Sequence, residues 1–384
     1  MRVLFSCVGD AGHFRPLLPL ARAFVAAGHA AAFAAPAAFA DRVEAAGFEA
    51  LSAGIPMREV RARVVELDAH LRTLPPLERR QLAFSVRFGE IAAPAKVRDL
   101  HAVASTWKPD LVVFESADLA APIVAAALEV PSVLHAFGRI VPLACYQRAA
   151  DATAPLWRDL GLEPQPLGGV YSGLYLDPCP PSLQSTSVPE GVRVEPIRPV
   201  FPLDPGESLP PRLEHLPDRP TVYVTLGTMF NELAVFRVLL AALADVDCNV
   251  VATVGRNNDP DELGPLPENA FIERYVAQSL LLPRSAATVT HGGSGSTLAA
   301  LAHGVPMLFV PQGADQFENA VACSEFGAGR VLMPGEVTEE AVREGVVALL
   351  EEAPYRERAA VLAAEIAALP APEELVGTLL VLHG

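Results

Sequence analysis

The stretch Thr290-His-Gly-Gly-Ser-Gly-Ser-Thr-Leu298 decides the fold prediction, because a glycine-rich turn stands there between an apolar run and a helical pattern. Its three glycines let the backbone approach a ligand closely. The start of the following helix offers unpaired N–H groups and the positive end of the helix dipole. Side-chain donors suited to two phosphates come from His291, Ser294, Ser296 and Thr297. The stretch therefore predicts a strand, an anion site and a helix, although Ser294 can also be a plain helix N-cap.

Apolar runs of strand length alternate with helical patterns on both sides of this stretch. Strands separated by helices of this length pair in parallel through right-handed crossovers. We therefore expect an α/β fold with two Rossmann-like parallel sheets. The expected strands are 2–8, 30–35, 48–51, 110–114 and 132–135 in the first half, and 221–226, 249–254, 286–290 and 307–310 in the second. The expected helices are 16–27, 37–46, 231–243, 294–303, 338–350, 355–368 and 373–382, and residues 56–107 are expected to be charged and helical.

The chain of 384 residues exceeds what one hydrophobic core usually serves, so two domains are expected. Residues 202–220 read PLDPGESLPPRLEHLPDRP, and repeated proline blocks both helix and central strand. We place a linker at 203–219, between an N-terminal domain of residues 1–202 and a C-terminal domain of residues 220–366. The two sheets are expected to face each other across a cleft. A last helix within 367–384 is expected to pack back on the N-terminal domain.

Composition excludes several classes of protein. Hydrophobic residues make up 51% of the chain and charged residues 19%, which excludes a disordered protein. A net charge of -16 argues against a nucleic acid partner, which would require a cationic surface. The five cysteines lie outside any C-x-x-C pattern, which fits neither a disulfide framework nor a zinc site. The N-terminus lacks a signal peptide pattern. No apolar run reaches the roughly 18 residues that a membrane span needs. We therefore expect a cytoplasmic protein without a membrane span. No pair of histidines has metal-ligand spacing, so neither a metal nor another cofactor is expected.

A second polar loop, Gly313-Ala-Asp-Gln-Phe-Glu-Asn319, follows the next predicted strand. In open α/β sheets ligands bind outside the carboxyl ends of the strands, so this loop and the glycine-rich turn should open onto one crevice. Asp315 supplies acceptors and Gln316 both a donor and an acceptor, which are the groups needed to hold sugar hydroxyls. Alternatively, Asp315 caps the helix that follows.

A histidine follows the first predicted strand, in the loop Gly9-Asp-Ala-Gly-His13. An imidazole suits proton removal because it titrates near neutrality, so His13 is the candidate base; a structural or merely exposed histidine is the alternative. Such a base needs a carboxylate that orients the ring. Glu115 and Asp118 both follow a later strand, and Asp118 can also cap the next helix. Asp10 is a third candidate, more typical of a turn.

These motifs together resemble the inverting nucleotide-sugar glycosyltransferases of GT-B fold and family-1 type, specifically the antibiotic and natural-product enzymes of actinomycetes. The strongest likeness runs from Tyr275-Val-Ala-Gln-Ser-Leu-Leu-Leu-Pro-Arg284 through VTHGGSGSTLAALAHGVPMLFVPQGADQFENA, which is similar to the family's donor signature. The stretch GHFRPLLPLARAFVAAGH resembles the family's N-terminal signature, whose histidine, here His13, is the base. The resemblance covers nearly the whole chain, and by it Glu115 is favoured as the partner of the base.

By this resemblance the C-terminal domain would bind the nucleotide. The diphosphate would be held by the backbone of the glycine-rich turn and by side chains at the helix start, at His291, Gly293, Ser294, Gly295 and Ser296. Thr228, in Thr225-Leu-Gly-Thr-Met229, would be a second phosphate contact, or else a simple N-cap.

The same resemblance assigns the residues that would contact the base of the nucleotide and the donor sugar. Tyr275 would stack on the base where the family often has tryptophan, and Val276 would offer its backbone to the base edge, although Ala277 replaces the usual proline. Asp315 and Gln316 would hold the donor sugar.

One departure from the family bears on the nucleotide. Members that use uridine donors often carry a glutamate that grips both ribose hydroxyls, and the matching position here is Ala299. A site that need not hold a 2′-hydroxyl suits deoxyribose. We therefore favour a dTDP-sugar over a UDP-sugar as the donor.

The expected protein is an inverting, metal-independent glycosyltransferase that moves a (deoxy)sugar to a hydroxyl of a natural-product aglycone such as a polyketide antibiotic. The acceptor would lie in the N-terminal domain, against 57–100 and the loop 135–146. Aromatic side chains that would line its pocket, unless they are ordinary core, are Phe84, Phe88, Phe137 and Tyr146. A sugar-nucleotide epimerase, a C- or N-glycosyltransferase and a catalytically silent homologue are the alternatives. A homodimer is compatible with the sequence.

Overall fold

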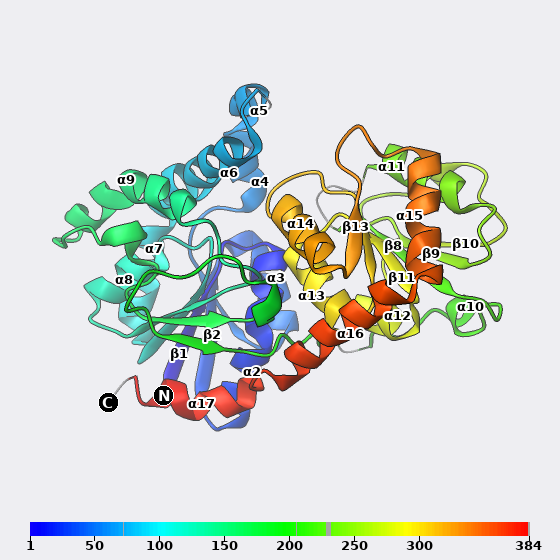
Figure 1. Ribbon diagram of the computed structural model, residues 1–384. Helices are drawn as coiled ribbons and strands as arrows, with labels where there is room; N and C mark the ends of the chain where they lie inside the picture. Colours follow the sequence, from blue (N-terminus) through cyan, green and yellow to red (C-terminus); the bar gives the residue numbers. More distant parts are fainter. Residues whose placement is uncertain (72, 205, 228–231, 383–384) are drawn as a thin grey trace. The chain divides into compact units, whose positions relative to one another are not determined.

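The computed structural model describes residues 1–71, 73–204, 206–227 and 232–382. The chain divides into two compact units, each built around one parallel sheet (Figure 1). The first unit comprises Met1–Pro178, Thr186–Arg198 and Pro370–Gly384, and the second comprises Cys179–Ser185 and Pro199–Leu369. The α/β class with two parallel sheets, expected from the sequence, is confirmed. Within the described ranges, no helix is long and apolar enough to span a bilayer.

The first unit contains a seven-stranded sheet in the order β3-β2-β1-β4-β5-β6-β7, in which all neighbouring strands are parallel. Its strands are β1 Arg2–Ser6, β2 Ala30–Ala35, β3 Glu49–Ser52, β4 Leu111–Glu115, β5 Ser132–His135, β6 Leu174–Asp177 and β7 Val194–Pro196. Its α-helices are α1 Ala11–Phe14, α2 Leu18–Ala26, α3 Ala40–Ala45, α4 Met57–Ala62, α5 Val65–Leu71, α6 Pro76–Phe84, α7 Ala93–Trp107, α8 Ala121–Ala127, α9 Leu143–Asp159 and α17 Pro372–Leu380. A π-helix spans Ser85–Ala92, and 3₁₀ turns span Arg15–Leu17, Ala37–Phe39 and Pro166–Gly169.

Apolar strands that are buried on both faces hold this sheet together, as is typical of parallel sheets. Successive side chains of a strand point to opposite faces. Leu4 and Val112 therefore pack in one hydrophobic cluster, whereas Val3, Phe5 and Val113 pack in another. The second cluster also takes in Leu375, Val376 and Leu379 of α17, which lies against α2. The last helix of the chain is thus part of the core of the first unit.

The second unit contains a six-stranded parallel sheet in the order β10-β9-β8-β11-β12-β13. Its strands are β8 Thr221–Thr225, β9 Asn249–Thr253, β10 Ala270–Glu273, β11 Ala287–Thr290, β12 Met307–Phe309 and β13 Gly329–Val331. Its α-helices are α10 Pro211–Glu214, α11 Leu233–Leu243, α12 Gln278–Leu281, α13 Ser294–Ala302, α14 Gln316–Phe326, α15 Glu339–Glu351 and α16 Ala353–Ala368, and its 3₁₀ turns are Pro181–Leu183, Pro260–Leu263 and Leu282–Arg284.

Several elements escaped the sequence analysis. β7 and β13 have only three residues each, one ending in proline and the other starting with glycine, so no periodicity marks them. β6 lies in the proline-crowded segment, and β10 follows a run of turn residues. Helix α9 starts at Leu143, so the predicted loop 135–146 is wrong at its end, and Tyr146 lies in a helix.

Two segments lie in a different unit from the one that the sequence suggested. Residues 179–185 and 199–202 fall within the expected N-terminal domain, yet they belong to the second unit. Cys179 and Leu183 pack in the same hydrophobic cluster as Tyr223 and Phe309, both from strands of the second sheet. The chain therefore passes between the units at residues 178–179, 185–186, 198–199 and 369–370.

Both sheets have a topological switch point, where the strand order reverses. It lies between β1 and β4 in the first sheet and between β8 and β11 in the second. Ligands of open α/β sheets bind at this point, outside the carboxyl ends of the strands. His13 follows β1 and Glu115 is the last residue of β4, while His291 directly follows β11. The candidate residues of each unit therefore stand at its switch point.

Candidate functional site

His13 and Glu115 form a hydrogen-bonded pair at the switch point of the first unit. His13 lies in α1, whose start is capped by Asp10 through the Gly12 N–H at 3.2 Å, which is the turn role considered for Asp10. Nδ1 of His13 is 2.8 Å from Oε2 of Glu115, and the imidazole is 20% exposed. When Nδ1 carries the proton and donates to the carboxylate, the lone pair is on Nε2. The pair is therefore arranged as an oriented base.

Glu115 is fully buried, and backbone donors compensate its charge. The N–H of Val8 donates to Oε1 at 3.2 Å, and the N–H of Ala117 donates to Oε2 at 2.7 Å. A buried carboxylate requires such partners, because an unpaired buried charge is strongly disfavoured. The loops after β1 and β4 thus fix the carboxylate that orients the ring of His13.

Asp118 does not contact the imidazole. Its Oδ2 accepts from the Lys96 ammonium at 2.6 Å, and its Oδ1 accepts from two N–H groups at the start of α8, at 3.2 and 3.3 Å. The structure therefore brings Glu115 to His13, whereas Asp118 binds Lys96 and accepts from the N–H groups of Ala120 and Ala121 where α8 begins.

Two of the four predicted acceptor residues lie beside the imidazole. The Phe137 ring meets the ring of His13 edge-on at 5.0 Å between centroids, and the Phe88 ring is tilted at 6.0 Å. Phe84 packs on Phe88 and on Tyr146, at 5.1 and 5.4 Å. Tyr146 is buried, and its hydroxyl donates to a backbone carbonyl at 2.9 Å. Phe88 and Phe137 thus flank His13, whereas Phe84 and Tyr146 belong to the core behind them.

His291, after β11 in the second unit, lies between two glycine backbones. A Cβ on either Gly227 or Gly293 would be 2.6 Å from its ring, closer than any side chain tolerates. Burial lowers the pKa of His291 to about 4, against a smaller opposing effect of the Asp315 carboxylate. The imidazole is therefore neutral near pH 7 and offers a hydrogen bond without a positive charge.

Asp315, from the loop after β12, accepts hydrogen bonds from the first residue of α13. Both the N–H and the hydroxyl of Ser294 donate to Oδ2 of Asp315, at 3.0 and 2.5 Å. The amide of Asn319 donates to the same oxygen at 3.1 Å and to the carbonyl of Gly292 at 2.8 Å. Asp315 stands at the N-cap position of its own helix α14, but its side chain makes no capping bond there. Asn319 is a member of this network that the sequence analysis missed, although it lies one helical turn after Asp315.

Gln316 is tied into its own turn by hydrogen bonds, whereas Gly295 borders open space. Oε1 of Gln316 accepts from the N–H groups of Gln312 and Gly313, at 2.7 and 3.0 Å, so this oxygen holds its own turn together. An added Cβ on Gly295 would meet nothing within 4 Å. The second residue of α13 therefore borders open space, as a backbone that contacts a ligand must.

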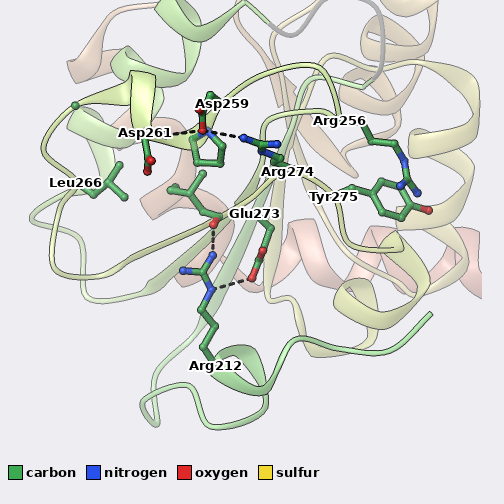
Figure 2. Close-up of a pocket in the computed structure, with 11 residues that line it drawn as sticks. Arg212, Arg256, Asp259, Asp261, Leu266, Glu273, Arg274 and Tyr275 are labelled. Atoms are coloured by element: carbon green, nitrogen blue, oxygen red, sulfur yellow. Dashed lines mark hydrogen bonds and ion pairs between the residues drawn. The ribbon is translucent and has the colours of Figure 1, made fainter. Parts of the chain in front are cut away.

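Tyr275 stands on the edge of a hollow of about 780 Å³ in the second unit (Figure 2). Its hydroxyl donates to Glu207 at 2.7 Å, and the guanidinium of Arg256 lies 3.7 Å from the centre of its ring. Val276, the next residue, is buried. Thr228 lies outside the described residues. Charged side chains dominate the rest of the hollow, namely Arg212, Asp259, Asp261, Glu273 and Arg274.

The described part of the chain contains no group of three or more His, Cys, Asp or Glu residues that could hold a metal ion. Two Asp-x-Asp sequences occur, Asp245-Val-Asp247 and Asp259-Pro-Asp261. In the second of these, Asp259 accepts a hydrogen bond from Arg274 at 3.1 Å.

Solved structures share this fold over the whole chain. The glycosyltransferase VinC, in complex with dTDP, matches with a TM-score of 0.82 and 26% identity, covering 100% of this chain and 99% of that one. The spinosyn rhamnosyltransferase SpnG, complexed with thymidine diphosphate, matches with a TM-score of 0.80 and 25% identity, covering 99% and 100%. Two parallel sheets with these likenesses define a GT-B glycosyltransferase, and the predicted fold class and enzyme class are confirmed.

The chain belongs to the family of erythromycin biosynthesis protein CIII-like glycosyltransferases, whose N-terminal domain matches residues 22–227 and whose C-terminal domain matches residues 237–382. It is 30% identical to the 3-alpha-mycarosylerythronolide B desosaminyl transferase of Saccharopolyspora erythraea, over 98% of this chain and 97% of that protein. It is 32% identical to the tylactone mycaminosyltransferase of Streptomyces fradiae, over 98% and 91%. The predicted likeness to actinomycete antibiotic enzymes is confirmed.

Proposed function

We propose that this enzyme transfers a deoxysugar from a dTDP-sugar to a hydroxyl group of a polyketide aglycone, with inversion at the anomeric carbon. The observation that carries the proposal is the imidazole of His13, with Nδ1 2.8 Å from a buried carboxylate at a switch point. Two relatives are named for transfer to an erythronolide derivative and to tylactone, which supports a polyketide acceptor.

The reaction would be a single displacement. Nε2 of His13 takes the proton of the acceptor hydroxyl as its oxygen forms a bond to the anomeric carbon. The bond between that carbon and the diphosphate oxygen breaks on the opposite face, and the nucleoside diphosphate leaves with the electron pair. Glu115 stabilises the imidazolium that results and holds the ring in the productive tautomer.

The diphosphate would bind at the start of α13. His291 donates a neutral N–H, and the backbone from Gly293 to Gly295 with the Ser296 hydroxyl adds further donors. The helix dipole favours negative charge at this end. Because these groups stabilise the leaving diphosphate, we propose that the reaction needs no metal ion. Thr228 remains the proposed second phosphate contact.

The donor sugar and the base of the nucleotide would bind to the loops that neighbour the start of α13. Asp315 can accept at both carboxylate oxygens, so it can hold a sugar hydroxyl while keeping its bonds to Ser294. Gln316 would donate from its amide, since its oxygen already holds the turn. Tyr275, fixed by Glu207, offers a rigid ring on which the base would stack, with Val276 at the base edge.

A dTDP-sugar is the proposed donor because α13 offers no acidic side chain to a ribose. Ala299 takes that position and is buried in the hydrophobic core of the second unit. Two similar enzymes have been solved with thymidine diphosphate, which supports a deoxyribonucleotide. The acceptor would lie against Phe88 and Phe137. We place the reaction in the cytoplasm, since the five widely spaced cysteines lie outside any C-x-x-C pattern and suit a reducing compartment.

The test is turnover by His13→Ala and His13→Asn, with exposed His70→Asn as the control. We expect a loss of about 10²–10⁴-fold in kcat for the two His13 variants and no change for the control. Wild-type turnover by a folded His13 variant would overturn the assignment of the base. Donor incubated without acceptor should remain unchanged; its epimerisation would favour an isomerase instead.

A further inference from the structure

Lys96 is a buried cation that the proposed reaction does not use. It lies on α7 and is 3% exposed, and it is one of two lysines, with Lys108, among 29 basic residues. Its ammonium donates to the carbonyl of Cys7 at 2.6 Å, to the carbonyl of Ala34 at 3.3 Å and to Asp118 at 2.6 Å. The three donors of an ammonium are thus matched by three acceptors from three separate segments.

These acceptors adjoin the backbone donors that hold Glu115. Cys7 is followed by Val8, whose N–H donates to the Glu115 carboxylate. Asp118 is preceded by Ala117, whose N–H donates to the same carboxylate. A shift at either end of this three-way contact would therefore move a donor of Glu115.

We propose that Lys96 is a positioning residue for the catalytic pair: its ammonium fixes the ends of β1 and β2 against the turn after β4, and so holds Glu115 where it orients His13. The inference rests on the proposed role of His13 as the base. The role of Lys96 is one of placement, because its ammonium donates to Cys7, Ala34 and Asp118.

The shape of lysine suits this position better than that of arginine. An ammonium is a point from which three donors diverge, whereas a guanidinium is a planar fork suited to bidentate partners. The chain uses arginine nearly everywhere else, so charge alone does not explain the lysine at this position. Ser6 adds to the same geometry, since its hydroxyl donates to the Asp118 oxygen that accepts from Lys96, at 2.7 Å.

The experiment compares Lys96→Met and Lys96→Arg with Lys108→Met, a control at the exposed C-cap that directly follows the same helix. Steady-state kinetics are measured well below the unfolding temperature of every variant, and a crystal structure of each folded Lys96 variant reports the His13–Glu115 distance. Ser6→Ala, a smaller change in the same network, covers the case in which neither Lys96 variant folds.

We expect both Lys96 variants to lose about tenfold or more in kcat, because small misplacements of catalytic groups are costly. The KM for the donor should stay within about twofold of the wild-type value. In the Lys108→Met control, both kcat and this KM should stay within about twofold of wild type. The His13–Glu115 distance should exceed the hydrogen-bonding limit of about 3.2 Å. Ser6→Ala should show the same pattern with a smaller loss.

The inference would be overturned by a folded Lys96 variant that keeps both the wild-type kcat and the His13–Glu115 distance. If neither Lys96 variant folds, the same result in Ser6→Ala would overturn it. The structural readout needs no turnover. If His13→Ala remains active, the proposed base is wrong, and the crystal structures still decide whether Lys96 holds the pair together.

Discussion

His13 and Glu115 meet at 2.8 Å although 102 positions separate them in the sequence. They meet because β1 and β4 are neighbours in the first sheet, with Ser6 opposite Phe114 in register. The carboxyl ends of these strands therefore lie together, and the loop after β1 reaches the last residue of β4. A hydrogen-bonded pair of this kind depends on strand order rather than on any local motif.

Removing the charge of Glu115 should impair catalysis without impairing donor binding. Glu115→Gln keeps the size of the side chain but no longer stabilises an imidazolium, so we expect kcat to fall by about 10–10³-fold. Exposed Glu163→Gln serves as the matched control. Steady-state kinetics with both substrates check this, and an undiminished kcat in folded Glu115→Gln would show that the carboxylate does not assist His13.

The two glycines at the start of α13 should respond differently to alanine. In Gly293→Ala the new Cβ would strike the His291 ring, so we expect a loss of stability of about 1–3 kcal/mol and weaker dTDP binding. In Gly295→Ala the Cβ meets open space, so stability should be unchanged or raised by up to about 1 kcal/mol.

Calorimetric titration with dTDP separates the two effects. Gly295→Ala should bind more weakly despite its intact fold, because the methyl group occupies space that the diphosphate would use. Wild-type affinity in Gly295→Ala would mean that the diphosphate does not approach this part of the backbone.

Stability should decrease on mild acidification because two histidines are buried in the neutral form. Burial lowers the pKa values of His135 and His291 to about 4 from an ordinary 6.5. The unfolded chain therefore binds these protons at a higher pH, so the stabilisation is complete above pH 6.5 and is lost as the pH falls toward 4. By pH 5 each histidine should cost about 2 kcal/mol.

Urea unfolding at pH 7.5 and pH 5 measures this loss. His291→Asn should reduce the difference between the two pH values, whereas His70→Asn, at an exposed position, should leave it unchanged. An equal pH dependence in His291→Asn and wild type would contradict the low pKa of His291.

The C-terminal helix should stabilise the first unit. Leu379 is fully buried among the side chains of that core, so Leu379→Ala should cost about 2–5 kcal/mol. Val381, two residues further, is 67% exposed, and Val381→Ala should change stability by less than about 0.5 kcal/mol. Thermal or denaturant unfolding compares them. Equal stabilities would show that the helix is not part of that core.

The sequence by itself determined the α/β class, most of the strands and the positions of His13 and the glycine-rich turn. These features are local: a buried parallel strand is a continuous apolar run, and a helix start after glycines is read from adjacent residues. The strands at 30–35 and 132–135 were predicted with their observed bounds for this reason.

The tertiary structure decided which carboxylate meets the histidine. Local patterns do not separate Glu115 from Asp118, which are three residues apart, and only the family resemblance favoured Glu115. Packing sends Asp118 to Lys96 and Glu115 to His13. Lys96, Gly227 and Asn319 gave no usable sequence signal, since each acts through partners brought close by strand order and loop packing. Long-range contacts of this kind depend on how the elements are arranged in space, and local sequence patterns do not predict that arrangement.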